Sequence, residues 1–292
     1  MPADVTMILI RYGETGLKGE PVRNRFEKLL VENISLAHKN ANVSCLFERQ
    51  RGRIFASSDM PEKTVEILSR TFGVVSFSLV EECSSEPEEI SKLAVSLASR
   101  ALADGMSFAV RARRTGSHPY SSMQLAAIVG EKILEASKGL ELKVDLTHPD
   151  LEIFVEVRDN RAFVFSEIIP GPGGLPLRSQ GRVLSIIEDK KSLLAAWLMM
   201  RRGCSTILLN QSDLSTRDIE LLKPWNPWWN GFIDSTDPLG ILRLKNCMGL
   251  VFGWSLEEFE SREKMQAGVP VFYPLIGMTE EEINERMARL FS

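Results

Sequence analysis

The sequence predicts an α/β protein made of three modules. Strand and helix signals alternate along its 292 residues, and a chain of this length usually forms two or three domains. The segment PGPGGLP at 170–176 marks a boundary, because its prolines and glycines can continue neither a strand nor a helix. We therefore expect modules at 1–80, 81–170 and 177–292, the last of them with a parallel sheet.

The first module has the element order β-α-β-β-α-β. The apolar run TMILIRYG predicts a strand, and Phe26, Leu30 and Ile34 recur at helical spacing within 22–37. The stretches NVSCLFER and GRIFASS predict a hairpin. A helix over 61–70 and the strand VVSFSLV complete an order that is typical of the ferredoxin-like fold.

The second and third modules continue the alternation. The acidic stretch EECSSEPEEI predicts a turn and then a helix over 87–102 with Ser85 as its cap. The strand SFAVRARR, a helix over 122–136 and the strands LKVDL, LEIFVEVR and AFVFSEII follow. After the linker, the strand RVLSII, a helix over 191–202 and the strand STILLN predict a parallel α/β domain. A final helix over 279–290 begins at a threonine cap.

The composition is that of a globular protein. Charged residues make up 25% and hydrophobic residues 44% of the chain, and no apolar run approaches the roughly 20 residues of a membrane-spanning helix. No basic region precedes the first apolar run, so we expect no signal peptide and a cytoplasmic location. The four cysteines are widely spaced, which favours reduced, buried thiols over disulfides or zinc. Because the net charge is −4, any binding of RNA must depend on local basic patches.

The strongest candidate for an anion site is the junction SFAVRARRTGSHPYSSMQ. Alternation along the strand places Arg111 and Arg113 on one face, and Arg114 follows them. Ser121 and Ser122 stand at the start of the next helix, whose free amides favour an anion. Guanidinium groups beside a helix N-terminus suit a phosphate. A solvated strand edge followed by a helix cap explains the same residues equally well.

Two further clusters are less specific. Lys18 and Arg25 belong to a basic stretch that Glu14, Glu20 and Glu27 dilute. Three of the five tryptophans lie in KPWNPWWNGF, at positions 225, 228 and 229. Stacking on RNA bases is conceivable there, but the only basic neighbour in the sequence is Lys223, so core packing or a dimer contact is favoured. The sequence has no H-E-x-x-H or G-x-S-x-G motif, so metalloenzyme and hydrolase functions have little support and no metal site is expected.

The junction between RVLSII and the helix after it is where a nucleotide-binding fold usually places a glycine-rich phosphate loop. Here the loop reads EDKKS, formed by Glu188, Asp189, Lys190, Lys191 and Ser192. On its own the stretch is compatible with an unusual phosphate site or with the remnant of one.

Several blocks together resemble one family. They are ILIRYGETGLKG, TFGVVSFS, FAVRARRTGSHPYSSMQLAAIVGEKI, VDLTHPDLEIFVEVRDNRAFVFSEIIPGPGGLP and VPVFYPLIGMTEEEI. They resemble the tRNA 4-thiouridine synthetases, also called ThiI thiamine-biosynthesis sulfurtransferases. The resemblance implies an N-terminal ferredoxin-like domain, a THUMP domain that binds tRNA near its acceptor end, and a Rossmann-like PP-loop domain that uses ATP. It also implies a homodimer, and tRNA-backbone contacts by Lys18, Arg25, Arg111, Arg113, Arg114, Ser121 and Ser122.

The resemblance fails where the chemistry should be. The family's PP-loop reads S-G-G-x-D-S, whereas this chain has EDKKS, one residue shorter, before the retained stretch AAWLMMRRG. Paired glycines let amides approach a pyrophosphate, but Glu188 and Asp189 would place like charge beside it. Trp254 stands in the acidic position of a T-G-E-S-like turn, and no C-x-x-C is present. We therefore expect a tRNA-binding protein with a truncated, degenerate PP-loop domain, without a cofactor and without sulfur transfer.

The sequence leaves two alternatives open. In the first alternative, the protein is an active tRNA sulfurtransferase or a thiazole-forming enzyme that uses ATP and Mg²⁺ through an altered loop. In the second, it is a scaffold that binds an intact paralogue and no RNA. Binding of ATP would favour the first, and indifference of tRNA binding to the loss of Arg111 and Arg113 would favour the second.

Overall fold

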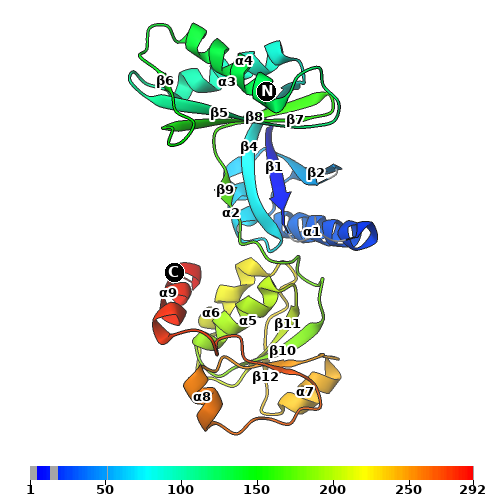
Figure 1. Ribbon diagram of the computed structural model, residues 1–292. Coiled ribbons are helices and arrows are strands. Elements are labelled where there is room, and N and C mark those ends of the chain that lie inside the picture. Colours follow the sequence, from blue (N-terminus) through cyan, green and yellow to red (C-terminus); the bar gives the residue numbers. More distant parts are fainter. Residues whose placement is uncertain (1–4, 14–18, 51, 292) are drawn as a thin grey trace.

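The computed structural model describes residues 5–13, 19–50 and 52–291. Within these residues the chain forms an elongated α/β molecule with one nine-stranded and one five-stranded sheet (Figure 1). The predicted α/β class, with a ferredoxin-like part and a parallel-sheet part, is confirmed. No helix in the described ranges has both the length and the apolar character needed to cross a membrane.

The first module is a four-stranded antiparallel sheet covered by two helices. Its elements are β1 (Thr6–Tyr12), α1 (Glu20–Asn40), β2 (Cys45–Gln50), β3 (Arg53–Ser58), α2 (Pro61–Ser69) and β4 (Val74–Ser84), with the strand order β2-β3-β1-β4. Alternation along β1 turns Ile8 and Ile10 toward Leu30 and Ile34 of α1. Leu9 packs on the other face against Phe163. Burial on both faces explains the near-continuous apolar run of this strand.

Strand β4 belongs to both N-terminal modules. Its first part pairs with β1, and its last four residues, Glu81 to Ser84, pair with β8. The turn predicted for EECS is therefore wrong. Acidic residues are rare in strands, but the ion pair between Arg161 and Glu82 offsets their charge across the ladder. The predicted cap is also wrong, because the amide of Ser85 donates to Asn160 O and the helix has Glu86 at its N-cap position.

The second module places two helices on one face of a sheet. Its elements are α3 (Pro87–Ala101), β5 (Ser107–Thr115), α4 (Ser122–Ala136), β6 (Lys143–Val144), β7 (Leu151–Arg158) and β8 (Arg161–Phe165). The strand predicted for AFVFSEII is interrupted: β8 ends at Phe165, and β9 (Ile169–Pro170) turns back to pair with β4. The linker then stays attached to the first module, since the amides of Gly171 and Gly173 donate to Val75 O and Val74 O.

The third module is a parallel sheet with the order β12-β11-β10-β13-β14. Its elements are β10 (Arg182–Ile187), α5 (Lys191–Arg201), β11 (Ser205–Asn210), α6 (Thr216–Ile219), the 3₁₀ helix η2 (Glu220–Trp225), β12 (Ile233–Asp234), α7 (Pro238–Leu244), β13 (Leu250–Val251), α8 (Leu256–Ser261), β14 (Val271–Phe272) and α9 (Glu280–Phe291). The predicted threonine cap is confirmed, because the amide of Glu282 donates to Thr279 Oγ1.

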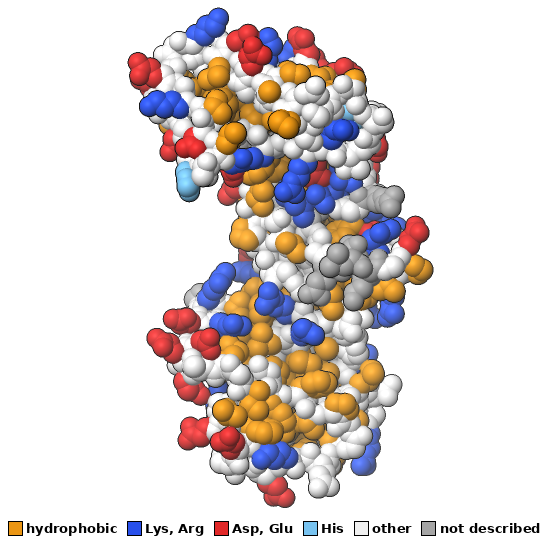
Figure 2. Space-filling model, viewed as in Figure 1, with side chains coloured by type: hydrophobic (Ala, Val, Ile, Leu, Met, Phe, Trp, Pro, Cys, Tyr) orange, Lys and Arg blue, Asp and Glu red, His pale blue; other side chains and the backbone are white. Residues whose placement is uncertain are grey.

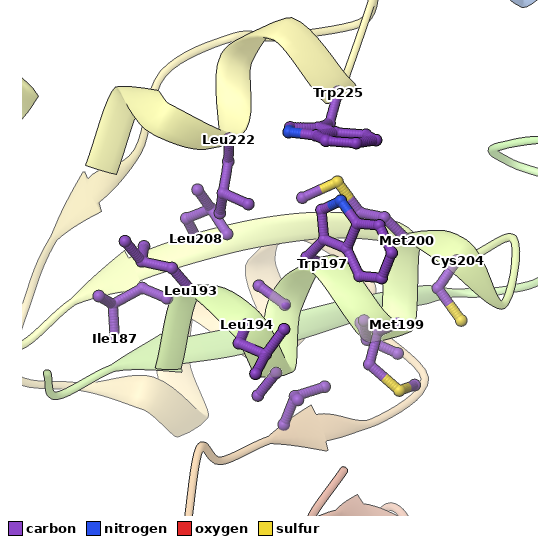
Figure 3. Packing of buried hydrophobic residues seen from close by; sticks show 14 of the residues in the cluster. Ile187, Leu193, Leu194, Trp197, Met199, Met200, Cys204, Leu208, Leu222 and Trp225 are labelled. Carbon is purple, nitrogen blue, oxygen red and sulfur yellow. The ribbon is translucent and has the colours of Figure 1, made fainter. Parts of the chain in front are cut away.

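The tryptophan cluster joins the third module to the first. Trp225 is 9% exposed and stacks on Phe72, with ring centroids 5.6 Å apart. It also meets Trp197 of α5 edge-on, with ring centroids 5.3 Å apart (Figure 3). The indole of Trp228 donates to Asn33 Oδ1 of α1 at 2.8 Å. Core packing is thereby confirmed for Trp225. Because Phe72 and Asn33 belong to the first module, this core also spans the contact between modules.

Candidate functional site

A cleft of about 650 Å³ lies where the first module meets the second. The residues that line it include Arg11, Ser76, Arg111, Arg113, Ser122, Met123, Glu152, Phe154, Glu156 and Phe165. Lys and Arg side chains gather on the visible surface at this junction (Figure 2). The structure therefore brings together three residues of the predicted basic patch, Arg111, Arg113 and Ser122, and adds Arg11 from the first module.

Arg111 and Arg113 of β5 differ in their partners. Arg111 Nε lies 2.8 Å from Glu152 Oε1, and its Nη2 donates to Leu146 O at 2.7 Å. Arg113 is exposed, and it has no ion-pair partner within 4.0 Å among the residues that the structure describes. Both side chains line the same cleft, which is consistent with the common face that strand alternation predicts. Arg113 thus presents an uncommitted guanidinium to the cleft.

Arg11 forms part of the floor of the cleft. Its Nη1 donates to Ser78 Oγ at 3.0 Å, and its guanidinium lies 4.9 Å from the centre of the Phe165 ring. Burial lowers the pKa of Arg11 to about 10, against the opposing effect of the nearby Glu156 carboxylate, so the side chain still carries its charge at neutral pH. The sequence signal was a single arginine within an otherwise apolar strand, but it did not show which residues Arg11 would face.

A buried carboxylate organises the arginines below the cleft. Glu156 is 6% exposed, and its Oε1 lies 2.9 Å from Arg53 Nε and 3.0 Å from Arg158 Nη1. With Arg11, Arg111 and Arg113, five arginines surround two carboxylates, those of Glu152 and Glu156. The cleft therefore has a net positive charge in a protein that is acidic overall.

The other predicted contacts lie outside this cleft. Arg114 is not among the residues that line it, and its Nη1 donates to Gly116 O at 3.3 Å. The Ser121 hydroxyl caps α4 by accepting from the Gln124 amide at 3.1 Å. Arg25 lines a separate groove between α1 and β2. Lys18 lies outside the described residues.

At the loop between β10 and α5, the protein supplies its own anion to the start of the helix. Asp189 Oδ1 accepts from the amide of Ser192 at 3.0 Å and from its hydroxyl at 2.8 Å. Lys191 Nζ lies 2.5 Å from Glu258 Oε2 and 3.7 Å from Asp189 Oδ2. Burial lowers the pKa of Lys191, but the hydrogen bond to Glu258 and the charges of Asp189 and Glu258 outweigh burial and leave it raised.

The turn after β13 closes this loop from the opposite side. Glu188 Oε2 accepts from the Trp254 indole at 2.6 Å and lies 3.3 Å from Arg262 Nη1. A Cβ placed on Gly253 would lie 2.6 Å from Ser192 Cα. The loop therefore packs directly against the turn, and both of its carboxylates have partners from the protein.

The thiols of this chain are poorly suited to nucleophilic chemistry. Burial raises the pKa of all four, to about 11 for Cys45 and Cys83, and Cys204 and Cys247 are buried. A thiol must ionise before it attacks. No group of three or more His, Cys, Asp or Glu side chains in the described part of the chain is arranged to hold a metal ion.

Two family models match the N-terminal half of the chain. The family model of the ThiI ferredoxin-like domain matches residues 7–78, and that of the THUMP domain matches 84–167. A protein of Methanosarcina mazei named probable tRNA sulfurtransferase is 30% identical over 329 aligned positions, which cover 96% of this chain and 81% of the relative. A protein of the same name from Methanobrevibacter smithii is 40% identical over 210 positions, but the match spans only 53% of that relative.

Solved structures show the same architecture over the full chain. The PH1313 protein from Pyrococcus horikoshii Ot3 superimposes with a TM-score of 0.82 at 31% identity, covering 98% of this chain and 99% of its own. A 4-thiouridine synthetase, solved as an RNA complex with bound ATP, shares the fold with a TM-score of 0.78 at 22% identity over 98% of this chain and 85% of its own. Given these matches over most of both chains, the protein belongs to the ThiI family of tRNA sulfurtransferases.

Proposed function

We propose that this protein binds tRNA in the cleft between its first two modules and does not carry out ATP-dependent sulfur transfer. The proposal that the protein binds tRNA rests on one observation. Arg11, Arg111 and Arg113 line the same cleft as Ser122. Arginine forks and hydroxyls are typical ligands of phosphate oxygens. The names of the relatives, which refer to tRNA, and the RNA-bound structural neighbour support the choice of ligand.

The loop geometry supports the absence of catalysis. Asp189 occupies the amide end of α5, where a phosphate would otherwise bind. A nucleotide would have to displace this carboxylate and would then lie beside Glu188 and Glu258, whose like charge disfavours it. Contact between Gly253 and Ser192 leaves no gap for a phosphate chain at that point. The residues present do not fit ATP. The raised pKa values of the thiols weigh further against sulfur transfer.

Titration calorimetry with ATP and Mg²⁺ tests this half of the proposal. We expect no heat of binding at micromolar concentrations, and no difference between wild type and Lys190→Ala. Binding of tRNA by the same preparation serves as the control for folded protein. Clear micromolar binding of ATP that Lys190→Ala abolishes would instead support the active enzyme with an altered loop.

Glu152 competes with phosphate for Arg111, so its neutralisation should strengthen RNA binding. Glu152→Gln keeps the shape of the side chain but frees Arg111 Nε from the ion pair at 2.8 Å. Because the pair is well exposed, we expect a modest gain of up to about fivefold in affinity for tRNA, measured by filter binding at fixed salt. Glu131→Gln, on an exposed acid of α4 outside the cleft, is the matched control. Equal gains for both variants would point to net charge alone.

A gel shift with tRNA, comparing wild type with R111E/R113E, tests the binding half. Unchanged retention of tRNA would favour the scaffold that binds an intact paralogue.

The homodimer and the cytoplasmic location remain predictions, as do the module boundaries at 80, 170 and 177.

A further inference from the structure

A second groove, of about 670 Å³, lies between the first module and the tryptophan segment of the third. Its walls come from the end of α1, from α2 and from residues 223–229. Lys63 of α2 and Arg70, the residue after that helix, line it together with Lys223, Asn226 and the ring of Trp229. The sequence separates Lys63 from Lys223 by 160 positions, so their convergence is a product of the fold.

The groove combines positive charge with an accessible aromatic ring. Its lining includes one carboxylate, Glu66 of α2, which is already paired at 2.7 Å with Arg70 at the end of that helix. Lys63 and Lys223 are exposed, and neither has an ion-pair partner within 4.0 Å among the described residues. Trp229 packs one side against the core of the third module but is only partly buried. Its indole is therefore shared between the core and the groove.

We propose that this groove is a second RNA contact, in which an unpaired nucleotide stacks on Trp229 while its phosphates meet Lys63 and Lys223. Ammonium groups neutralise backbone phosphates without regard to sequence, and a partly exposed indole is a stacking surface for any base. The inference rests on the proposed function, because the occupant is a strand of the RNA that the first cleft holds. It assigns RNA binding to the third module as well as to the first two.

The test compares filter binding of full-length tRNA, over a range of salt concentrations, for K63E/K223E and for Trp229→Leu. We expect K63E/K223E to flatten the dependence of log K on log salt by about two. Trp229→Leu, which keeps an apolar contact with the core, should weaken binding by about tenfold without changing that slope. K138E/K245E reverses two exposed charges outside both grooves and controls for net charge, while thermal melting confirms that each variant is folded.

The outcomes separate this inference from the function on which it rests. If R111E/R113E abolishes binding while K63E/K223E and Trp229→Leu bind as wild type does, the second contact is wrong and the proposed function stands. If wild type itself does not retain tRNA, both are wrong. A loss with K138E/K245E equal to that with K63E/K223E would also overturn the groove, since net charge would then explain the effect.

Discussion

The double variant R111E/R113E is expected to bind tRNA at least about a hundredfold more weakly than wild type, because each lost charge-assisted hydrogen bond costs roughly 1.5–3 kcal/mol. Both guanidinium groups line the cleft from the same face of β5, and the variant replaces them with carboxylates that repel phosphate. The slope of log K against log salt should fall by about two, one for each phosphate contact removed. Filter binding at several salt concentrations measures both quantities.

Two further variants test whether the loss of binding is specific to the cleft arginines. Glutamate at position 111 would face Glu152, so R111Q/R113Q, which removes the charges without adding repulsion, should show a smaller loss in the same direction. K138E/K245E carries the same change in net charge as R111E/R113E and should bind nearly as wild type does. Full retention of tRNA by R111E/R113E, with an unchanged salt slope, would contradict the cleft as the binding site.

The sequence predicted helices and strands well where the spacing of their hydrophobic residues followed one clear period. The bounds predicted for α4, β7, β10 and β11 agree with the structure, because caps and alternation define these segments without help from neighbours. The end of β4 was missed for the opposite reason. EECS has the composition of a turn, and only pairing with β8 and the ion pair to Arg161 make it a strand.

The candidate sites were predictable only in part. The shared face of Arg111 and Arg113 follows from strand alternation, but the place of Arg11 beside them depends on β4 joining two modules into one sheet. Likewise, the missing glycines of EDKKS were visible in the sequence. The capping of α5 by Asp189 was not, because it depends on side-chain geometry in the loop. Of the cations that line the groove with Trp229, Lys63 comes from α2, far away in the sequence.

Trp225→Ala is expected to cause the largest loss of stability, about 3–5 kcal/mol, which is typical for removal of a buried large aromatic side chain. Trp225 is 9% exposed and is held between Phe72 of the first module and Trp197 of α5. Truncation leaves a cavity that neither module can close without moving relative to the other. Urea denaturation followed by circular dichroism measures the loss. Phe272→Ala, at a 39% exposed ring, is the control and should cost less than about 1.5 kcal/mol.

Because Trp225 lies between the first and third modules, a double-mutant cycle can show whether its aromatic contacts couple the unfolding of the two modules. If the aromatic contact couples the modules, Phe72→Ala and Trp225→Ala should be non-additive by about 0.5–3 kcal/mol in a double-mutant cycle. Trp225→Ala should also split a single unfolding transition into two, because the third module then unfolds without the first. Additive losses within one sharp transition would contradict the coupling and would mean that Asn33, Trp228 and the linker hold the modules together without the ring stack.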